Sequence, residues 1–566
     1  MRTPARSFDD IARAYRRPDL DAVAAEARAL AGAVTGAATA ADAIAAVSQW
    51  NALRSRVDTA YNIAAVRYEQ DTRDPARKAE QAFWDETAPL RRELDVVYAR
   101  ALLDCPHRDA LAGHFGPQLL RLKQCAAVTF APEIRDALAE EARLTSRYQE
   151  LMSEPGVDFR GQKLSLSGIA RYFADADRDT RLAAQRARDA FLAARAGDLD
   201  GIYDRLVALR DHMGRALGYD GFTPLGYKLM SRADYGPDEV AVFRDALRDA
   251  VVPLVADLRR AQARRLGVEP LLFHDEPVFD VRGNPRPRGD ARAIVAAARR
   301  MYDELHPDVG AFFAMMDDCG LLDLELRDGK APGGFCTNFA DYGVPFVFAN
   351  FNGTDHDVAV VTHECGHAFQ CWSARDQPLI EYAFPTYEAA EVHSMAMEFL
   401  TYPWMELFFG DDADRYRRIH VETEIAMLPY MAAVDHFQHE IYADPSLSPP
   451  QRNARWLDME ARYLPYRDYG GLLPYLGQGT IWQRQGHIYQ VPFYYIDYAL
   501  AFVCAAQVWM RAERDRDAAL RDYVAMCEVG GSVSFTEMLE AGRLRSPFDP
   551  EVLRDVTGFI RSYLGL

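Results

Sequence analysis

Two histidines four residues apart enclose a glutamate in His363-Glu364-Cys365-Gly366-His367, an H-E-x-x-H pattern. Residues four apart share one face of a helix, so both imidazoles can bind one Zn²⁺ at about 2.0–2.1 Å. Glu364 can then accept a proton from a water on the metal, as a general base does in hydrolysis. The alternative is a pair of core histidines on a buried helix, but two buried imidazoles beside a carboxylate would need polar partners.

A catalytic zinc also needs a third protein ligand. The ligand does not follow the motif as it does in metzincins, because Gln370 and Ser373 stand where glycine and histidine are required. A second predicted helix, which begins near Thr386, carries four candidates: Glu388, Glu391, His393 and Glu398. Glu391 follows two alanines, which would let the helix approach the metal closely. Spacing alone does not separate Glu391 from His393.

A tyrosine-rich segment at residues 487–498 holds His487 and four tyrosines: Tyr489, Tyr494, Tyr495 and Tyr498. Peptide hydrolysis develops an oxyanion, and a phenol that is protonated at neutral pH is a suitable hydrogen-bond donor to it. If the segment is helical, Tyr495 and Tyr498 lie on one face, three residues apart. The alternative is an aromatic helix face packed in the core.

Most of the chain has the periodicity of long amphipathic helices. Helices are predicted at residues 132–152, 179–196, 200–216, 237–265 and 288–304, and helical periodicity returns after residue 354. A polar stretch at 161–167 predicts a small β element. Between about 268 and 354, glycine, proline, β-branched and aromatic residues predict strands and turns, including a strand at 343–351. Together with Gly333 and Gly334, that strand would offer a backbone edge to an extended peptide.

These elements predict a predominantly α-helical fold with a small sheet near the site. We place an N-terminal helical domain at residues 1–200 and a catalytic unit at residues 201–566 that includes the sheet. No fixed-period repeat or low-complexity linker divides the chain.

The composition excludes several classes of protein. The 566 residues include 65 Lys and Arg against 84 Asp and Glu, a net charge of −19. This acidity disfavours binding to nucleic acid or to anionic lipid. Some of it would line a substrate channel and favour cationic peptides. The eight scattered cysteines, the lack of a secretory signal and the lack of an apolar span predict a cytoplasmic protein with free thiols.

Several motifs in this order resemble the M3 family of zinc oligopeptidases, of the thimet oligopeptidase and oligoendopeptidase F type. The similar stretches are Gly329-Lys-Ala-Pro-Gly-Gly-Phe-Cys336, His363-Glu-Cys-Gly-His-Ala-Phe369, Ala390-Glu-Val-His-Ser-Met-Ala-Met-Glu398, Gly486-His-Ile-Tyr489 and Pro492-Phe-Tyr-Tyr-Ile-Asp-Tyr498. Weaker similarity extends back to Asp177 and covers most of the chain.

The resemblance implies a role for each candidate residue. It makes Glu391 the third ligand, beside His363 and His367, and leaves Glu398 as a carboxylate behind the ligands or a helix-packing residue. It implies that His487 and a tyrosine pair bind substrate and stabilise the tetrahedral intermediate. We favour Tyr498 as the principal donor with Tyr495 assisting, although the main donor among Tyr494, Tyr495 and Tyr498 stays open because the histidine–tyrosine spacing varies in the family.

The resemblance further implies a two-lobed zincin-type peptidase, in which the N-terminal helices wall a deep channel. The predicted function is hydrolysis of internal bonds of short oligopeptides with one Zn²⁺ per chain, with no nucleic-acid or membrane partner. The alternatives are a dipeptidyl carboxypeptidase of the same family and a catalytically silent helical peptide-binding protein. The sequence leaves the oligomeric state open between monomer and dimer.

Overall fold

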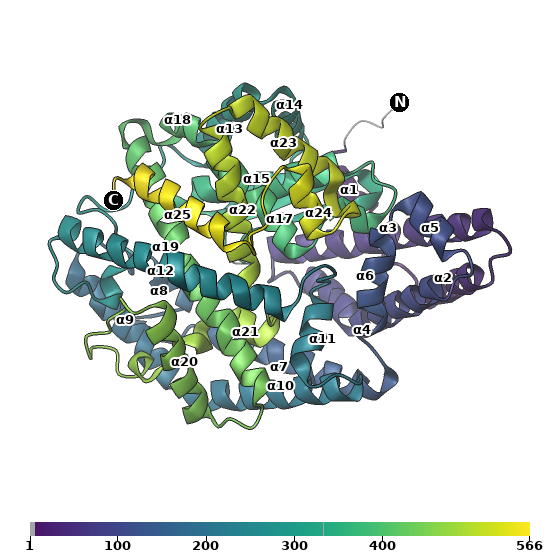
Figure 1. The fold of residues 1–566 in the computed structure, drawn as a ribbon, viewed down its shortest axis with the longest axis horizontal. Coiled ribbons are helices and arrows are strands. Elements are labelled where there is room, and N and C mark those ends of the chain that lie inside the picture. Colours follow the sequence, from purple (N-terminus) through teal and green to yellow (C-terminus); the bar gives the residue numbers. More distant parts are fainter. Residues whose placement is uncertain (1–5, 332) are drawn as a thin grey trace.

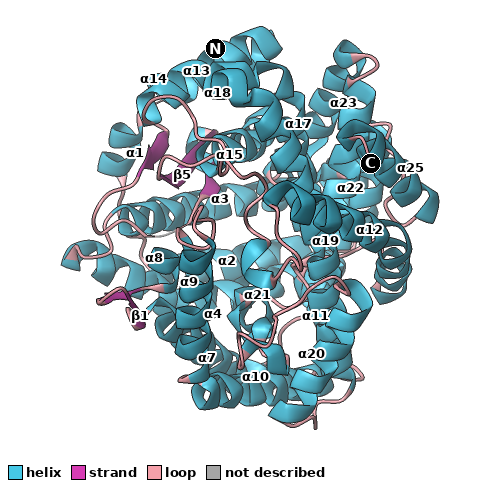
Figure 2. Ribbon diagram, turned by 90° about the vertical axis from the view of Figure 1, so that its left-hand side faces the viewer, coloured by secondary structure: helices cyan, strands magenta, loops and turns pink. Residues whose placement is uncertain are grey.

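The computed structural model describes residues 6–331 and 333–566. Residues 1–5 and Pro332, a member of the glycine motif above, lie outside the described residues. The described chain is predominantly α-helical with two small sheets, as the sequence predicts. Figure 2 shows helices on every side of the molecule and strands in only two places.

The N-terminal helices share a hydrophobic cluster of their own, at the right of Figure 1. At its centre Trp50 stacks on Tyr98, with ring centroids 4.1 Å apart. Leu379 and Tyr382, from much later in the chain, complete the cluster and join it to the rest of the molecule. Its helices are α2 (Leu20–Thr35), α3 (Ala40–Gln70), α4 (Pro75–Leu103), α5 (Arg108–Phe115) and α6 (Gln118–Ala127).

The next stretch follows the predicted helical periodicity closely. Its helices are α7 (Arg135–Ser153), α8 (Leu166–Ala170), α9 (Arg178–Ala193), α10 (Ala196–Ala216), α11 (Phe222–Leu229) and α12 (Pro237–Leu266). The predicted polar β element is a hairpin of β1 (Val157–Phe159) and β2 (Gln162–Leu164). Its turn residues Arg160 and Gly161 both have positive φ, which matches the right-handed twist of the strands.

The second sheet is smaller than the region predicted for it. Within residues 268–354, α13 (Ala291–Leu305) and α14 (Pro307–Asp318) are helical. The strands are β3 (Leu322–Glu325), β4 (Phe335–Phe339) and β5 (Val344–Phe351), in the order β3-β5-β4. The prediction that strand 343–351 offers a backbone edge is wrong, because β5 pairs with β3 on one side and β4 on the other. The edge strand beside the motif is β4.

Two helices that carry the candidate ligands pack directly on each other: α15 (His356–Ser373) and α17 (Tyr387–Leu400). A methyl group on Gly366 would lie 2.7 Å from the carbonyl oxygen of His393 and from the Cα of Ser394. Only glycine therefore permits this approach of the two backbones. α19 (Ala413–Ala443) and α22 (Ile496–Ala512) pack around the pair, and their side chains belong to the main hydrophobic core.

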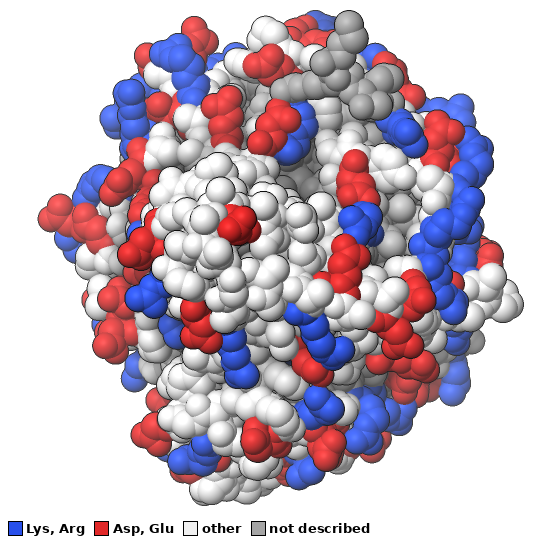
Figure 3. Space-filling model, turned by 90° about the vertical axis from the view of Figure 1, so that its right-hand side faces the viewer, with Lys and Arg blue, Asp and Glu red and all other residues white. Residues whose placement is uncertain are grey.

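The remaining helices are α1 (Phe8–Ala14), α16 (Ile380–Ala383), α18 (Met405–Phe409), α20 (Pro449–Tyr463), α21 (Gly486–Gln490), α23 (Arg516–Val529), α24 (Phe535–Ala541) and α25 (Pro550–Leu564). Among the described helices, none combines the length and apolar character needed to cross a bilayer. On the face drawn in Figure 3, acidic and basic side chains are interspersed around an uncharged area. The division of the chain at about residue 200 stays a prediction.

Candidate functional site

The structure brings His363, His367 and Glu391 together at the contact of α15 and α17. Their ligand atoms all lie within 4.8 Å of one another. Glu391 Oε2 is 3.2 Å from His363 Nε2 and 3.4 Å from His367 Nε2. Ligands bound tetrahedrally at zinc bond lengths of about 2.0–2.1 Å are about 3.3–3.4 Å apart. Both histidine nitrogens therefore already lie at the distance from Glu391 that a tetrahedral metal ion requires.

The other three positions considered for the third ligand do not join this group. His393 is fully buried, and its Nδ1 lies 2.7 Å from the carbonyl oxygen of Ala389. Its ring lies beside that of Tyr523, with centroids 6.3 Å apart. Glu388 is also fully buried; desolvation raises its pKa to about 7 against the opposing pull of Arg232.

Glu398 lies behind the candidate ligands. Its Oε1 is 2.7 Å from His363 Nδ1, and its Oε2 is 2.6 Å from His420 Nε2. Tyr402 extends this series of polar contacts, with its hydroxyl 2.6 Å from His420 Nδ1. Burial opposes the charge of Glu398, but the two histidines outweigh it and lower the pKa of the carboxyl. A carboxylate in this position fixes the orientation of a ligating imidazole. His420 and Tyr402 were not identified from the sequence.

Glu364 has a different environment. It is 8% exposed, and among the described residues its Oε2 has no hydrogen-bond partner. A methyl group on Gly334, at the start of the edge strand β4, would lie 3.6 Å from Glu364 Oε1. Desolvation raises the pKa of Glu364, with the two histidines of the motif opposing the shift. A buried, unpartnered carboxylate of raised pKa is suited to accept and return a proton.

Tyrosine hydroxyls line the other side of Glu391. Tyr494 donates a hydrogen bond of 2.9 Å to Glu391 Oε1, and Tyr498 donates one of 3.0 Å to the Tyr494 hydroxyl. Ser394 donates to Glu391 Oε2 at 3.0 Å. The residue in direct contact with the ligand is thus Tyr494, while Tyr498 lies one hydroxyl further away.

His487 and Tyr495 lie beside this pair. The ring of His487 is 4.7 Å from that of Tyr495, 5.4 Å from Tyr494 and 6.1 Å from Tyr498, measured between centroids. The side chain of Gln485 lies 2.7 Å from His487 Nδ1. Burial lowers the pKa of His487 to about 4, which makes it a neutral imidazole at pH 7. The four aromatic residues form one cluster that contacts the candidate metal ligands through Tyr494.

The tyrosine segment is not one helix. α21 ends at Gln490, α22 begins at Ile496, and Phe493 between them has a φ of +69°. The buried guanidinium of Arg232 donates 2.7 Å to the Phe493 carbonyl and 2.5 Å to Asp497 Oδ1. This clamp holds the turn in a conformation that non-glycine residues rarely adopt. The turn places Tyr494, outside the helix, against Glu391.

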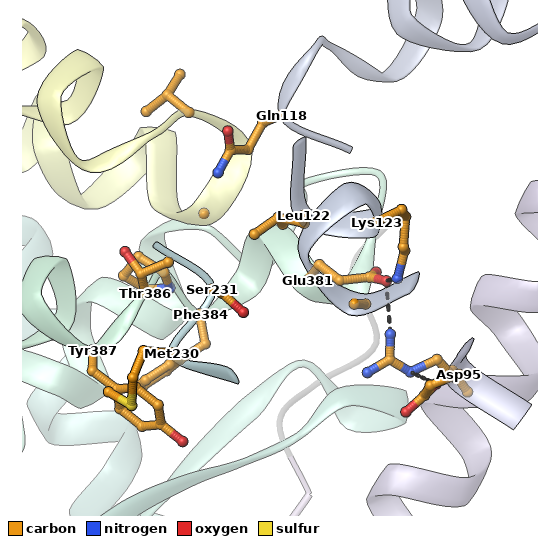
Figure 4. A pocket seen from close by; sticks show the side chains of 15 residues that line it. Asp95, Gln118, Leu122, Lys123, Met230, Ser231, Glu381, Phe384, Thr386 and Tyr387 are labelled. Carbon is orange, nitrogen blue, oxygen red and sulfur yellow. Dashed lines mark hydrogen bonds and ion pairs between the residues drawn. The ribbon is translucent and has the colours of Figure 1, made fainter. Parts of the chain in front are cut away.

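Two cavities flank the site. One, of about 520 Å³, is lined by Phe384 and Tyr387 at one end and by Lys123 and Glu381 at the other (Figure 4). The Phe384 ring is 6.1 Å from that of His367, and the Tyr387 ring is 4.8 Å from that of Tyr494. The second, of about 470 Å³, includes Ala359, one helical turn before His363, and His420.

Comparison with known proteins gives the family. The model of the peptidase M3 N-terminal domain matches residues 9–130, and that of peptidase family M3 matches residues 286–557. No curated protein sequence matched the chain.

Solved structures match along the full length. A structure described as an oligoendopeptidase F is 43% identical with a TM-score of 0.94 and covers 99% of both chains. PZ peptidase A, solved with an inhibitor, is 40% identical with a TM-score of 0.93 over 97% of this chain and 98% of its own. An oligoendopeptidase F from Bacillus anthracis str. Ames is 38% identical with a TM-score of 0.90 over 100% and 99%. The chain belongs to peptidase family M3 and is a metallopeptidase of the oligoendopeptidase F type, which hydrolyses oligopeptides.

Proposed function

We propose that the protein is a zinc-dependent endopeptidase that cleaves internal bonds of short oligopeptides. The observation that carries the proposal is the spacing of His363 Nε2, His367 Nε2 and Glu391 Oε2, at 3.2 and 3.4 Å from the carboxylate oxygen. These residues would hold one Zn²⁺ per chain. When bound, the ion supplies a Lewis acid and lowers the pKa of water at its open position.

The chain's own residues divide the remaining work. Glu364 takes the proton of the attacking water and passes it to the leaving amine. Tyr498, assisted by Tyr495 and the neutral imidazole of His487, donates hydrogen bonds to the oxyanion that develops at the scissile carbonyl. Tyr494 and Ser394 hold Glu391 from both of its oxygens.

The two flanking cavities support binding of a peptide across the metal ligands, with one end in each cavity. The edge strand β4, which begins directly after Gly334 beside Glu364, would align the substrate backbone between them. We further propose that the N-terminal helices wall this channel in a two-lobed molecule and exclude folded proteins. Six buried free thiols fit a reducing cytoplasm: Cys105, Cys125, Cys365, Cys371, Cys504 and Cys527.

Product mapping tests the endopeptidase mode against its rival, the dipeptidyl carboxypeptidase. A peptide acetylated at its N-terminus and amidated at its C-terminus is incubated with the enzyme, and the fragments are identified by mass spectrometry. Cleavage of the doubly blocked peptide at internal bonds is expected. Cleavage only of the free acid, with release of successive dipeptides from its C-terminus, would replace the proposed mode by the rival.

Metal analysis of the purified protein tests the ion. About one zinc per chain is expected, with loss of activity after chelation and recovery on adding Zn²⁺. Full activity in the chelated protein would refute the proposal.

A further inference from the structure

A buried arginine without a counter-ion lines the second cavity. Arg188, on α9, is 6% exposed, and neither its Nε nor its Nη2 has a hydrogen-bond partner among the described residues. No carboxylate oxygen of those residues lies within 4.0 Å of its guanidinium, which instead lies over the rings of Phe173 and Phe273 at 4.6 and 5.6 Å. A buried cation left unpaired by the fold destabilises the protein unless something else neutralises it.

Two more arginines extend from Arg188 towards the catalytic cluster. The guanidinium of Arg467 lies 5.1 Å from the centre of the Phe273 ring and 5.8 Å from that of the Tyr430 ring. The guanidinium of Arg484 lies 5.5 Å from the centre of the Tyr430 ring. Arg188, Phe273, Arg467 and Arg484 thus form one wall of the cavity, with Tyr430 outside its lining. Like Arg188, Arg484 has no ion-pair partner within the described part of the chain, and its Nε is buried and unpartnered.

This wall leads to the candidate active site. The hydroxyl of Tyr430 donates a 3.1 Å hydrogen bond to Gln485, whose amide contacts His487. The ring of Tyr430 also lies 6.0 Å from that of Tyr495. The arginine side of the cavity is therefore joined to the His487 and tyrosine cluster through Tyr430 and Gln485, which lie between them.

The acidic groups of the same cavity do not neutralise the two unpaired arginines. Glu276 is shared between Arg467, at 3.1 Å, and Arg259, at 3.7 Å. Burial raises the pKa of Asp355 and of Glu424, the latter to about 7, so the charge of both is disfavoured. The cavity therefore differs from the expected acidic channel: in a protein of net charge −19 it has a cationic surplus.

We propose that this cavity is an anion-binding subsite in which Arg188, with Arg484, binds a carboxylate of the peptide substrate. The inference rests on the proposed peptidase function. Guanidinium groups bind carboxylates with paired, charge-assisted hydrogen bonds, and a cavity of about 470 Å³ is in the range of ligand sites. The carboxylate has two possible sources, the substrate C-terminus and an Asp or Glu side chain.

Matched peptides test the proposal and separate the two sources. One quenched peptide is made as the free acid and as the C-terminal amide, and a second pair has Glu or Gln at each position flanking the cleaved bond. For the wild type we expect kcat/KM to be about tenfold higher for the carboxylate form of one pair, chiefly through KM. The pair that shows the preference identifies the source.

Variants then assign the preference to Arg188. Arg188→Met is expected to reduce the carboxylate preference to twofold or less, and Arg188→Lys to keep part of it. Because the readout is a ratio between two peptides, a general loss of activity does not affect it. The matched control is Arg186→Met, which removes the same charge from an exposed position of α9 and should leave the ratio unchanged. Arg484→Met gives a second test if the Arg188 variants do not fold.

A binding measurement separates this inference from the proposed function. Fluorescence anisotropy of a labelled acid and its amide is measured on the Glu364→Gln protein, with and without Arg188→Met. Preferential binding of the acid that disappears with Arg188→Met supports the subsite even if the wild-type enzyme cleaves no peptide, in which case the proposed function fails alone. Equal affinity for acid and amide in the first protein, together with equal affinity for the Glu and Gln peptides, would overturn the subsite.

Discussion

Buried charged groups are paired around the candidate metal ligands and unpaired on the substrate side of the site. Around the candidate ligands the charged groups are paired: both oxygens of Glu398 meet a histidine, and Glu391 accepts hydrogen bonds from Tyr494 and Ser394. On the substrate side, within the described residues, Glu364 Oε2 and the Nε and Nη2 of Arg188 have no partner.

Buried polar atoms without partners each cost about 1–3 kcal/mol. The difference separates groups that hold the site from groups that wait for a ligand. The cavity on the Tyr387 side follows the first pattern, because its Lys123 and Arg54 share Glu381. Substitutions on the two sides should therefore have different consequences.

The largest loss of activity is expected for Glu364→Gln, on the substrate side, where the buried charged groups have no partners. Loss of the proposed general base should lower kcat by about 10²–10⁴-fold, while metal content stays at that of the wild type, because Glu364 is outside the candidate ligand set. Steady-state assays and metal analysis on the same preparation measure both quantities. Turnover at the wild-type rate would remove Glu364 from the mechanism.

Tyr494 and Tyr498 sharpen the comparison, because Tyr494 contacts the candidate ligand Glu391, whereas Tyr498 is the proposed oxyanion donor. Tyr498→Phe should lower kcat by about 10²-fold with zinc retained, because an oxyanion donor is lost. Tyr494→Phe removes the hydrogen bond to Glu391 and should weaken zinc binding as well. Activity and zinc affinity are measured for both variants. The reverse pattern, with zinc affinity lost only in Tyr498→Phe, would contradict the assignment.

On the paired side, Glu398→Gln should act through the metal. Removing the charge that orients His363 is expected to weaken zinc affinity by about 10–100-fold, with kcat of the fully loaded enzyme much less changed. Competition with a chelator gives the affinity. Glu440→Gln, a partly exposed carboxylate on α19, is the matched control. Unchanged affinity in Glu398→Gln would show that the pairing behind the ligands is dispensable.

The smallest effect concerns the paired cavity and its dependence on pH. Burial opposes ionisation of Glu381, but Lys123 and Arg54 outweigh it and lower its pKa from 4.5 to about 2. A pKa lowered by folding means that the stabilisation, about 3 kcal/mol, is present above pH 4.5 and is lost as the pH falls through about 2.

The Tm of Glu381→Gln should therefore lie a few degrees below that of the wild type at pH 6, and the difference should shrink towards pH 3. Thermal melts at several pH values measure it. Glu140→Gln, which removes an exposed ion pair with Arg205, should change Tm little at any pH. A difference for Glu381→Gln that does not depend on pH would contradict the assigned pKa.

Local pattern was enough to predict the helices and the facing histidines of α15, because periodicity and the i, i+4 rule act within one turn. The sequence pattern places the return of helical periodicity after residue 354, and α15 begins at His356. Asp357 in its first turn accepts the N–H groups of Asn352 and Gly353.

Choices that depend on tertiary packing were not available to spacing rules. Glu391 and His393 are two residues apart on α17, and which of them meets the histidines depends on the face that packs against Gly366. The resemblance to the M3 family, and not the spacing, indicated Glu391.

The tyrosine segment shows the same limit more clearly. The turn at Phe493 is held by Arg232, which is 261 residues earlier in the chain, and no local pattern announces it. Likewise, Arg188 reads as an ordinary helical arginine until the fold places it between two aromatic rings without a carboxylate.

The contact at Gly366 also limits which ion the site can accept. Because the backbones of α15 and α17 touch there, the helices cannot move closer, and the surrounding core prevents them from separating. Helix packing therefore fixes the distance between the histidine pair and Glu391. Calcium, with bonds of about 2.3–2.6 Å and six to eight oxygen ligands, would require α15 and α17 to move apart. We therefore expect Gly366, although it touches no metal, to contribute to the preference of the site for a small ion.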